Sequence, residues 1–297
     1  MNSSKSSPPF VLQSGKSRNV IFETPHLGRA TPDELQRHSK LVEAAARRWD
    51  NHIDRAGEMM LSEVGGEWIG SVYSRMVVDL NRGPDRVDSR VSPDWPGARI
   101  YEDGGVIVPF VKNKTVLNAL YENPLNPEEI EHRLKLYWFP FHDQLQARID
   151  AILHRFGHAI LISLHSAEPE PEHCQGDMPV IYLGTGNGST CDAGMLSIIR
   201  TVLEKSNIRV ISELYYQGAF TTQAYRKDPH VHAVQIELDR RFMKTDAEIK
   251  RQLEPLAAAL QSVSTGGVGI APSSSRAKRL SVRRTYIDPL TGDVLPY

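Results

Sequence analysis

The chain has 297 residues, of which 40% are hydrophobic and 24% are charged, and its 35 basic and 36 acidic residues give a formal net charge of −1. This composition is typical of a globular protein with a substantial core, and it excludes a globally basic nucleic-acid-binding protein. Because two cysteines cannot form a disulfide framework and no segment is apolar enough to span a bilayer, we expect a cytoplasmic protein without a membrane segment.

The first half of the chain alternates between strand and helix patterns. Apolar, β-branched residues at 19–22 predict a strand that stops at a proline and glycine turn, which places His26 at its C-terminal end. A capping-box pattern with proline at the first helical position predicts a helix over residues 31–50. Two further strands are expected at about 68–80 and 106–111, separated by turns.

The second half continues this alternation. Asn126 is expected to cap a helix that Pro140 interrupts. The most hydrophobic strand, 159–164, is apolar on both faces, which is typical of a central strand covered by helices on both sides. The remaining patterns predict strands at 180–183, 208–212 and 231–238, and helices over 192–205 and from 245 onward. We therefore predict an α/β protein, specifically a three-layer α/β/α sandwich with a mixed central sheet.

The expected domain organisation has three parts. Residues 1–17 are rich in serine and are expected to form a flexible N-terminal segment, and residues 18–265 form the single domain. Residues 266–297 are expected to be a loosely ordered basic tail, with five positive charges within nine residues. A solvated tail is the simplest interpretation of this charge, and an adaptor that binds nucleic acid or protein through it is the alternative.

Polar residues at the ends of predicted strands are the first candidates for chemistry. Ligands bind at the carboxyl ends of strands in open α/β sheets. His26 and His165 follow two such strands, and Glu237 lies within a third. Two histidines and a carboxylate fit an open zinc site, which takes three protein ligands and keeps one position for water. The chain has 11 histidines, so ordinary loop histidines remain an alternative.

A guanidinium at a strand end is the second kind of candidate. Arg82 offers a bidentate clamp for a substrate carboxylate. Arg75 lies seven residues earlier on the same expected strand, and this odd spacing places the two on opposite faces unless a bulge intervenes. Only one of them is then expected to point into the cleft from the strand.

The order of these motifs resembles that of the N-formylglutamate amidohydrolase family. The similarity extends from about His26 to Met243, and its most specific part is a Ser-Arg…Asp-Leu-Asn-Arg run. The residues that carry it are His26 in Thr-Pro-His-Leu-Gly, residues 73–82, residues 137–142, residues 164–166 and residues 232–237.

The resemblance implies both a fold and a set of residue roles. The family is similar in fold and metal site to the zinc carboxypeptidases and aspartoacylase, which implies a zinc-carboxypeptidase-like architecture and one Zn²⁺ ion. His26 and His165 match the histidine ligands, and Glu237 matches the general base. Asn81 and Arg82 match the pair that grips the substrate carboxylate, with Arg75 in the same run.

The third zinc ligand does not follow the carboxypeptidase pattern. Those enzymes use a glutamate three residues after the first histidine, where this chain has Arg29. The resemblance instead implies an acid in the segment 50–54, and we choose Asp50, with His52 and Asp54 as reserves.

These roles imply a zinc-dependent amidohydrolase that acts on a small N-formyl or other N-acyl amino acid, similar to N-formylglutamate. The chain departs from the family pattern at Ser163, where an aspartate is usual, and at Gln223 and Ala224, where a basic residue and a histidine are usual. These departures leave open a catalytically silent relative that binds only a metal or an acyl amino acid. We expect no membrane or nucleic-acid partner.

Overall fold

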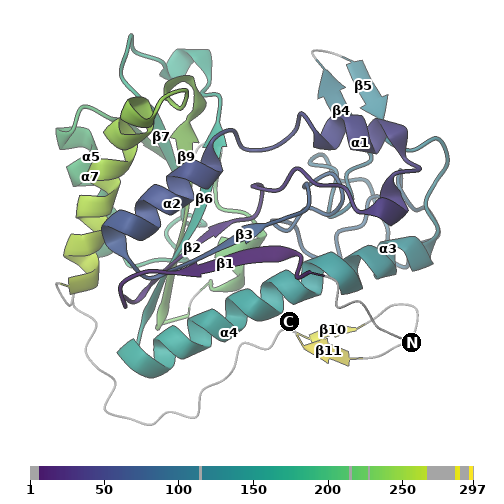
Figure 1. Cartoon of the computed structure of the whole chain (residues 1–297), viewed down its shortest axis with the longest axis horizontal. Coiled ribbons are helices and arrows are strands. Elements are labelled where there is room, and N and C mark those ends of the chain that lie inside the picture. The colour runs from purple at the N-terminus through teal and green to yellow at the C-terminus, as the bar shows by residue number, and fades with distance from the viewer. Residues whose placement is uncertain are drawn as a thin grey trace.

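The computed structural model describes residues 7–113, 116–213, 216–226 and 228–265, and the short strands 285–287 and 294–296. Seven strands form one sheet (Figure 1). Their spatial order is β1 (Phe10–Ser14), β3 (Glu67–Ser71), β2 (Val20–Thr24), β6 (Ala159–Ala167), β9 (Val231–Asp239), β7 (Val180–Gly184) and β8 (Arg209–Ser212).

The sheet is mixed, as predicted. Strand β2 runs parallel to β3 and β6, and β6 runs parallel to β9. The edge strand β1 is antiparallel to β3, and β7 is antiparallel to β9. Because the four central strands are parallel, their carboxyl ends lie at the same edge of the sheet.

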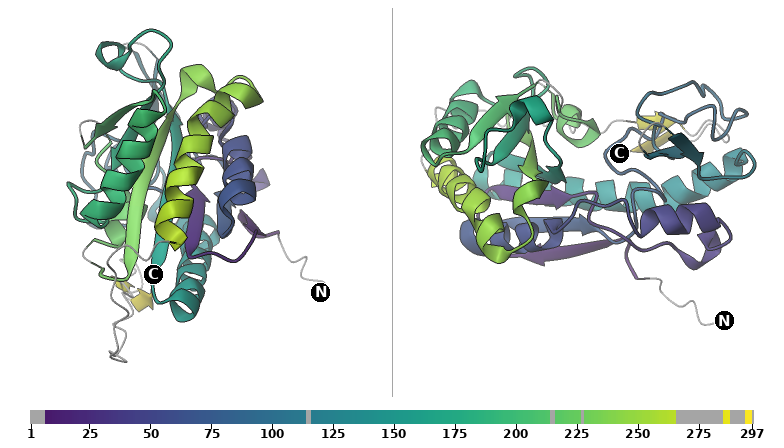
Figure 2. Two further views of the ribbon diagram at one scale, coloured as in Figure 1. Left: turned by 90° about the vertical axis from the view of Figure 1, so that its left-hand side faces the viewer. Right: turned by 90° about the horizontal axis from the view of Figure 1, so that it is seen from above.

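Helices cover both faces of this sheet. On one face lie α2 (Ile53–Val64), α5 (Ala193–Lys205) and α7 (Asp246–Thr265), which Figure 2 shows next to one another. On the other face α4 (Phe139–Phe156) crosses beneath the sheet (Figure 1). Two buried hydrophobic clusters fill the spaces between the sheet and the helices. The predicted α/β/α sandwich is therefore confirmed.

The remaining elements are short. The helices are α1 (Ser39–Ala45), α3 (Pro127–Arg133) and α6 (Phe220–Ala224), with 3-10 turns at Asp33–Leu35, Pro171–His173 and Arg240–Phe242. Two separate hairpins pair β4 (Phe110–Asn113) with β5 (Val116–Ala119) and β10 (Thr285–Ile287) with β11 (Val294–Pro296). None of the helices in the described part of the chain has the length and apolarity that a membrane crossing requires.

The helix predicted over 31–50 is wrong in extent. The structure has only a 3-10 turn and α1 there, and it adds α2, which the sequence analysis missed. The chain turns between the two helices because the backbone N–H of Asp50 donates to the carbonyl of His26, and His52 takes a left-handed conformation with φ of 58°. This turn brings residue 50 back to the end of β2.

The strand predicted over 68–80 is also wrong in extent. It ends at Ser71, and residues 72–80 form a loop whose backbone pairs with residues 28–30. Arg75 and Arg82 are therefore not on one strand, and the alternation argument for their opposite faces fails. The strand expected at 106–111 begins only at Phe110.

Pro140 does not interrupt its helix. Residues 127–156 are continuously helical because a π-helical turn, Leu134–Trp138, precedes the proline, which then stands in the first turn of α4. The wider turn and the N-terminal position both tolerate the missing proline N–H. Asn126 caps the first helix as predicted, accepting a hydrogen bond from the Glu129 N–H.

Two expectations about the termini meet the structure differently. Part of the segment 1–17, expected to be flexible, forms the edge strand β1, which pairs with β3 over five residues. The hydrophobic pattern there is short, and pairing with a long-range partner decides its conformation. Apart from the β10–β11 hairpin, the expectation for the tail 266–297 lies outside the described residues.

Candidate metal centre and active site

One face of the sheet changes from apolar to polar toward its carboxyl edge. Ile21 and Leu161 lie in the hydrophobic cluster between the sheet and α4. Side chains two or four residues further along β2 and β6 face the same side of the sheet. These positions hold Glu23, Ser163 and His165, all buried. The parallel register of β6 and β9 then sets His165 beside Glu237. A polar floor is thus built from three neighbouring strands.

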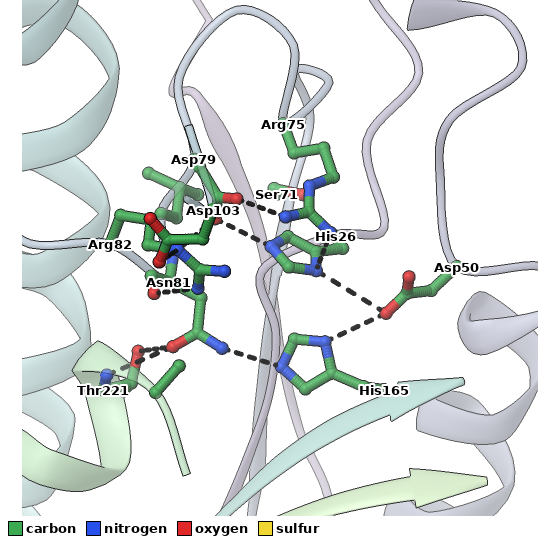
Figure 3. A network of polar contacts seen from close by, with 12 residues as sticks. His26, Asp50, Ser71, Arg75, Asp79, Asn81, Arg82, Asp103, His165 and Thr221 are labelled. Atoms are coloured by element: carbon green, nitrogen blue, oxygen red, sulfur yellow. Dashed lines mark hydrogen bonds and ion pairs between the residues drawn. The ribbon is translucent and has the colours of Figure 1, made fainter. Parts of the chain in front are cut away.

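Two histidines and one aspartate converge above this floor (Figure 3). Oδ2 of Asp50 lies 2.9 Å from Nδ1 of His165 and 3.7 Å from Nδ1 of His26. All three side chains are buried, and a ligand atom from each lies within 4.8 Å of the other two. Among the residues expected in the segment 50–54, the structure brings Asp50 to the histidines. Asp54 instead lies 4.0 Å from Arg29, and the His52 ring contacts Trp49.

The tautomer of His26 is fixed from behind. Its Nε2 lies 2.8 Å from Oδ1 of Asp79, and because a carboxylate only accepts hydrogen bonds, Nε2 must be the donor. Asp79 also accepts from the guanidinium of Arg75 and from the backbone N–H of Asn81. Nδ1 of His26 is then the unprotonated nitrogen, directed toward Asp50.

The charges of this cluster are strongly coupled. Burial alone would raise the pKa of Asp79, but Arg75, His26 and Arg82 outweigh it and hold that pKa well below its usual value. Burial would likewise raise the pKa of Asp50, and the two histidines lower it instead. Both aspartates are therefore ionised at neutral pH.

Glu237 faces the same cavity from β9. Its Oε1 accepts a hydrogen bond of 2.9 Å from the Gln235 amide, and burial raises its pKa above the usual value. The neighbouring arginines have other partners, since Arg240 donates to the carbonyl of Ser166 and Arg241 pairs with Asp239. Glu237 is therefore held in place by the Gln235 amide, while these two nearby arginines contact other groups.

A cavity of about 750 Å³ opens above the three converging side chains. Its walls include Arg75, Asn81, Arg82, Arg240, Gln223 and Glu237. Arg82 donates to the carbonyl of Asn81 at 2.9 Å and forms an ion pair with Asp103, with Nε and Oδ2 2.8 Å apart. The guanidinium is therefore anchored at the cavity wall.

Arg75 and Asn81 contact the residues of the histidine and aspartate cluster, whereas Arg82 does not pair with its histidines. Arg75 is paired with Asp79 at 2.5 Å, and its Nη1 lies 3.3 Å from Nδ1 of His26. The Asn81 amide nitrogen lies 3.2 Å from Nε2 of His165, while its oxygen accepts from the backbone N–H of Thr221. Both side chains line the cavity, but their polar atoms are mainly engaged within the protein.

Sequence reasoning missed two residues of this cluster. Asp79 belongs to the Ser-Arg…Asp-Leu-Asn-Arg run, but it lies on a loop and not on the expected strand, so its contact with His26 was not predicted. Arg240 lines the cavity with Nη2 3.8 Å from Oδ1 of Asp50. The position of Arg240 directly after the strand that carries Glu237 could have indicated from the sequence that it lies at the site.

Comparisons with known proteins agree on one family. Residues 18–243 match the model of the N-formylglutamate amidohydrolase family. A curated N-formylglutamate deformylase of Pseudomonas putida is 29% identical over 252 residues, which are 82% of this chain and 88% of that protein. The N-formylglutamate deformylase of Pseudomonas aeruginosa is 28% identical over 233 residues, covering 74% and 79% of the two chains.

Solved structures show the same fold. The crystal structure of N-formylglutamate amidohydrolase from Ralstonia eutropha JMP134 has a TM-score of 0.71 at 21% identity, covering 87% of this chain and 98% of that one. A gene product of Agrobacterium tumefaciens has a TM-score of 0.63 at 17% identity, covering 86% and 96%. At these identities the likeness concerns the fold.

Proposed function

The chain belongs to the N-formylglutamate amidohydrolase family, and we propose that it hydrolyses the amide bond of an N-formyl or other N-acyl amino acid with the help of one zinc ion. The two deformylase relatives support amidohydrolase activity. The observation that carries the proposal is the convergence of His26, Asp50 and His165 beside Glu237 at one cavity.

The donor set fits zinc. Two imidazole nitrogens and one carboxylate oxygen are ligands that zinc prefers, and three protein ligands are the usual number at a catalytic zinc site. Asp79 behind His26 supplies the outer hydrogen bond that metal-binding histidines ordinarily have. We therefore assign His26, Asp50 and His165 as the ligands. Bound zinc would lower the pKa of a water molecule and polarise the substrate carbonyl.

Glu237 is the proposed general base. Burial raises its pKa toward the range in which a carboxylate exchanges protons effectively near neutral pH. We propose that Glu237 accepts a proton from the attacking water and delivers it to the leaving amine. Its hydrogen bond from Gln235 fixes the carboxylate orientation for both transfers.

Arg82 is the proposed clamp for the substrate carboxylate. Its guanidinium lines the cavity, and a planar fork matches a carboxylate in two parallel hydrogen bonds. We propose that Arg75 and Asn81 shape the same wall and assist through the contacts that hold Asp79 and His165.

The two free cysteines, Cys174 and Cys191, agree with our expectation of a cytoplasmic enzyme.

The direct test measures metal content and amine release together. Protein purified without chelator is expected to carry about one zinc per chain, and the double change His26→Ala, His165→Ala is expected to remove it. The same preparation is then assayed for amine release from N-formyl, N-acetyl and longer N-acyl amino acids. Zinc retained by the double variant would contradict the ligand assignment. A zinc-loaded protein that binds these compounds and releases no amine would be a catalytically silent relative instead.

A further inference from the structure

A buried carboxyl group beneath the candidate metal centre has no part in the proposed reaction. Glu23 is the penultimate residue of β2, and its side chain is fully buried on the same face of the sheet as His165. Neither of its carboxyl oxygens has a hydrogen bond of normal geometry in the described part of the chain. Burial raises the pKa of Glu23, which the Ser163 and Thr221 hydroxyls partly offset. Burying a carboxyl group without a hydrogen-bond partner costs free energy.

Ser163 stands between this carboxyl group and His165. Glu23 and Ser163 are direct register partners on the parallel strands β2 and β6, so their side chains lie next to each other on the same face of the sheet. On its other side, Oγ of Ser163 lies 3.1 Å from Nε2 of His165. The three side chains therefore form a row that leads from β2 to the imidazole.

The direction of hydrogen bonding in this row follows from the geometry of His165. Its Nδ1 points at Asp50, so a metal at the cluster would be bound through Nδ1, and the ring proton would have to be on Nε2. Nε2–H then needs an acceptor. The Asn81 amide presents its nitrogen to Nε2, because its oxygen accepts from Thr221. Among the contacts of the described residues, the remaining acceptor is the Ser163 hydroxyl.

We propose that Ser163 and Glu23 are positioning residues that hold His165 in the tautomer that binds metal, and this inference rests on the proposed zinc site. His165 Nε2–H donates to Ser163 Oγ, and the Ser163 hydroxyl donates to the Glu23 carboxyl. The arrangement parallels that behind His26, where the carboxylate of Asp79 accepts directly from Nε2. Each histidine thus has a carboxyl group behind it, and at His165 a hydroxyl joins the two.

The test measures zinc affinity by competition with a chromophoric chelator on metal-stripped protein. Ser163→Ala is expected to weaken zinc binding about 10- to 100-fold, the usual effect of removing an outer-shell partner. Glu23→Leu is expected to weaken it to a similar degree. Because both changes break the same row, the double variant should lose no more than Ser163→Ala alone. Losses that add in the double variant would overturn the proposal.

A matched control and an exchange variant separate positioning from general stability. Thr190→Val also removes a buried hydroxyl, one that donates to the Ala233 carbonyl, and it should leave zinc affinity within about twofold. The pair Glu23→Ser, Ser163→Asp moves the carboxyl group across the strand pair to a position next to His165. It is expected to restore most of the affinity that Glu23→Ser alone loses, and it also decides the question if Glu23→Leu fails to fold.

The outcomes for the two proposals are distinct. Wild-type protein without zinc affinity would contradict the proposed metal site itself. Wild-type protein that binds zinc tightly, together with equal binding by Ser163→Ala, would leave the metal site standing and refute the role of Ser163 and Glu23. Loss of affinity in the exchange variant, with a thermal midpoint of the metal-free form close to that of wild type, would refute it as well.

Discussion

Nε2 of His26 lies 2.8 Å from Oδ1 of Asp79, a residue 53 positions further along the chain. The turn that follows strand β2 supplies the histidine, and the loop that follows β3 supplies the carboxylate. The contact therefore depends on the whole course of residues 72–80 over the strand ends. It makes this loop part of the proposed metal centre, although none of its side chains is a proposed ligand.

Asp79→Asn tests this contact. The amide can present its NH₂ group to Nε2 and favour the tautomer in which Nδ1 is protonated and unable to bind metal. We expect zinc affinity to fall about 10- to 100-fold, measured by chelator competition. Asp88→Asn is the matched control, because Asp88 is equally buried and paired with an arginine, Arg90, but lies outside the cavity lining. Equal losses of zinc affinity in both variants would show that Asp79 acts only through stability.

Arg82→Lys tests the carboxylate clamp. Lysine keeps the charge but cannot reproduce the planar fork or the two contacts that Arg82 makes with Asn81 and Asp103. The expected result is a KM raised roughly 10-fold for carboxylate substrates with a smaller change in kcat. Arg90→Lys, which disturbs a bidentate pair elsewhere in the same loop region, should leave KM unchanged. A KM penalty for Arg82→Lys that is the same for carboxylate and amide substrates would rule out the clamp.

The positions of residues near the carboxyl ends of parallel strands could be predicted from the sequence. Their apolar patterns mark β2, β6 and β9, and parallel strands bring their carboxyl ends to one edge. His26, His165 and Glu237 therefore came together as expected from local patterns and one rule of topology. The same patterns were sufficient for the mixed sheet and the three layers, because the apolar alternation of each strand is local information.

The positions of residues on loops could not be predicted from the sequence in this way. Asp50 reaches the histidines through a backbone hydrogen bond to His26 and the left-handed conformation of His52, and neither has a distinctive sequence pattern. Asp79 depends on the early end of β3, where the apolar pattern continues but the strand does not. The π-helical turn before Pro140 was not predicted for a similar reason. Packing against the core, and not local propensity, keeps that helix continuous.

His142 is expected to make stability depend on pH. It is buried against Trp138, with ring centroids 4.0 Å apart, and its Nε2–H donates to the carbonyl of Leu80 at 2.9 Å. Burial lowers the pKa of His142 to about 3 and outweighs that hydrogen bond, which acts in the opposite direction. The unfolded chain binds the proton at a pKa of about 6.5. Between these two values only the unfolded chain is protonated, so stability falls as the pH falls through this window and is retained in full above it.

The measurement is chemical denaturation between about pH 7 and pH 4, where one such group contributes about 1.4 kcal/mol per pH unit. His142→Gln keeps an N–H donor for Leu80 but does not titrate, and it should reduce the slope by about that amount. His132→Gln removes an exposed histidine on α3 and should leave the slope as in wild type. An unchanged slope in His142→Gln would show that another group is responsible.

Glu237→Gln separates chemistry from binding, because it preserves the shape of the side chain and removes the proton acceptor. We expect kcat to fall roughly 100-fold or more with zinc content unchanged. The pH profile gives an independent readout. Because burial raises the pKa of Glu237 above its usual value, kcat/KM of the wild type should rise with pH as the carboxyl ionises, with an apparent pKa above 4.5.

The acidic limb of that profile should be absent from the residual activity of Glu237→Gln, because the amide has no proton to lose. Gln235→Leu provides the companion variant, since it removes the hydrogen bond that orients the carboxylate and leaves the carboxylate itself in place. It should lower kcat less than Glu237→Gln and keep the acidic limb. If a folded Glu237→Gln enzyme turns over at a rate near that of wild type, Glu237 is not the base, and a different group must carry the proton to the leaving amine.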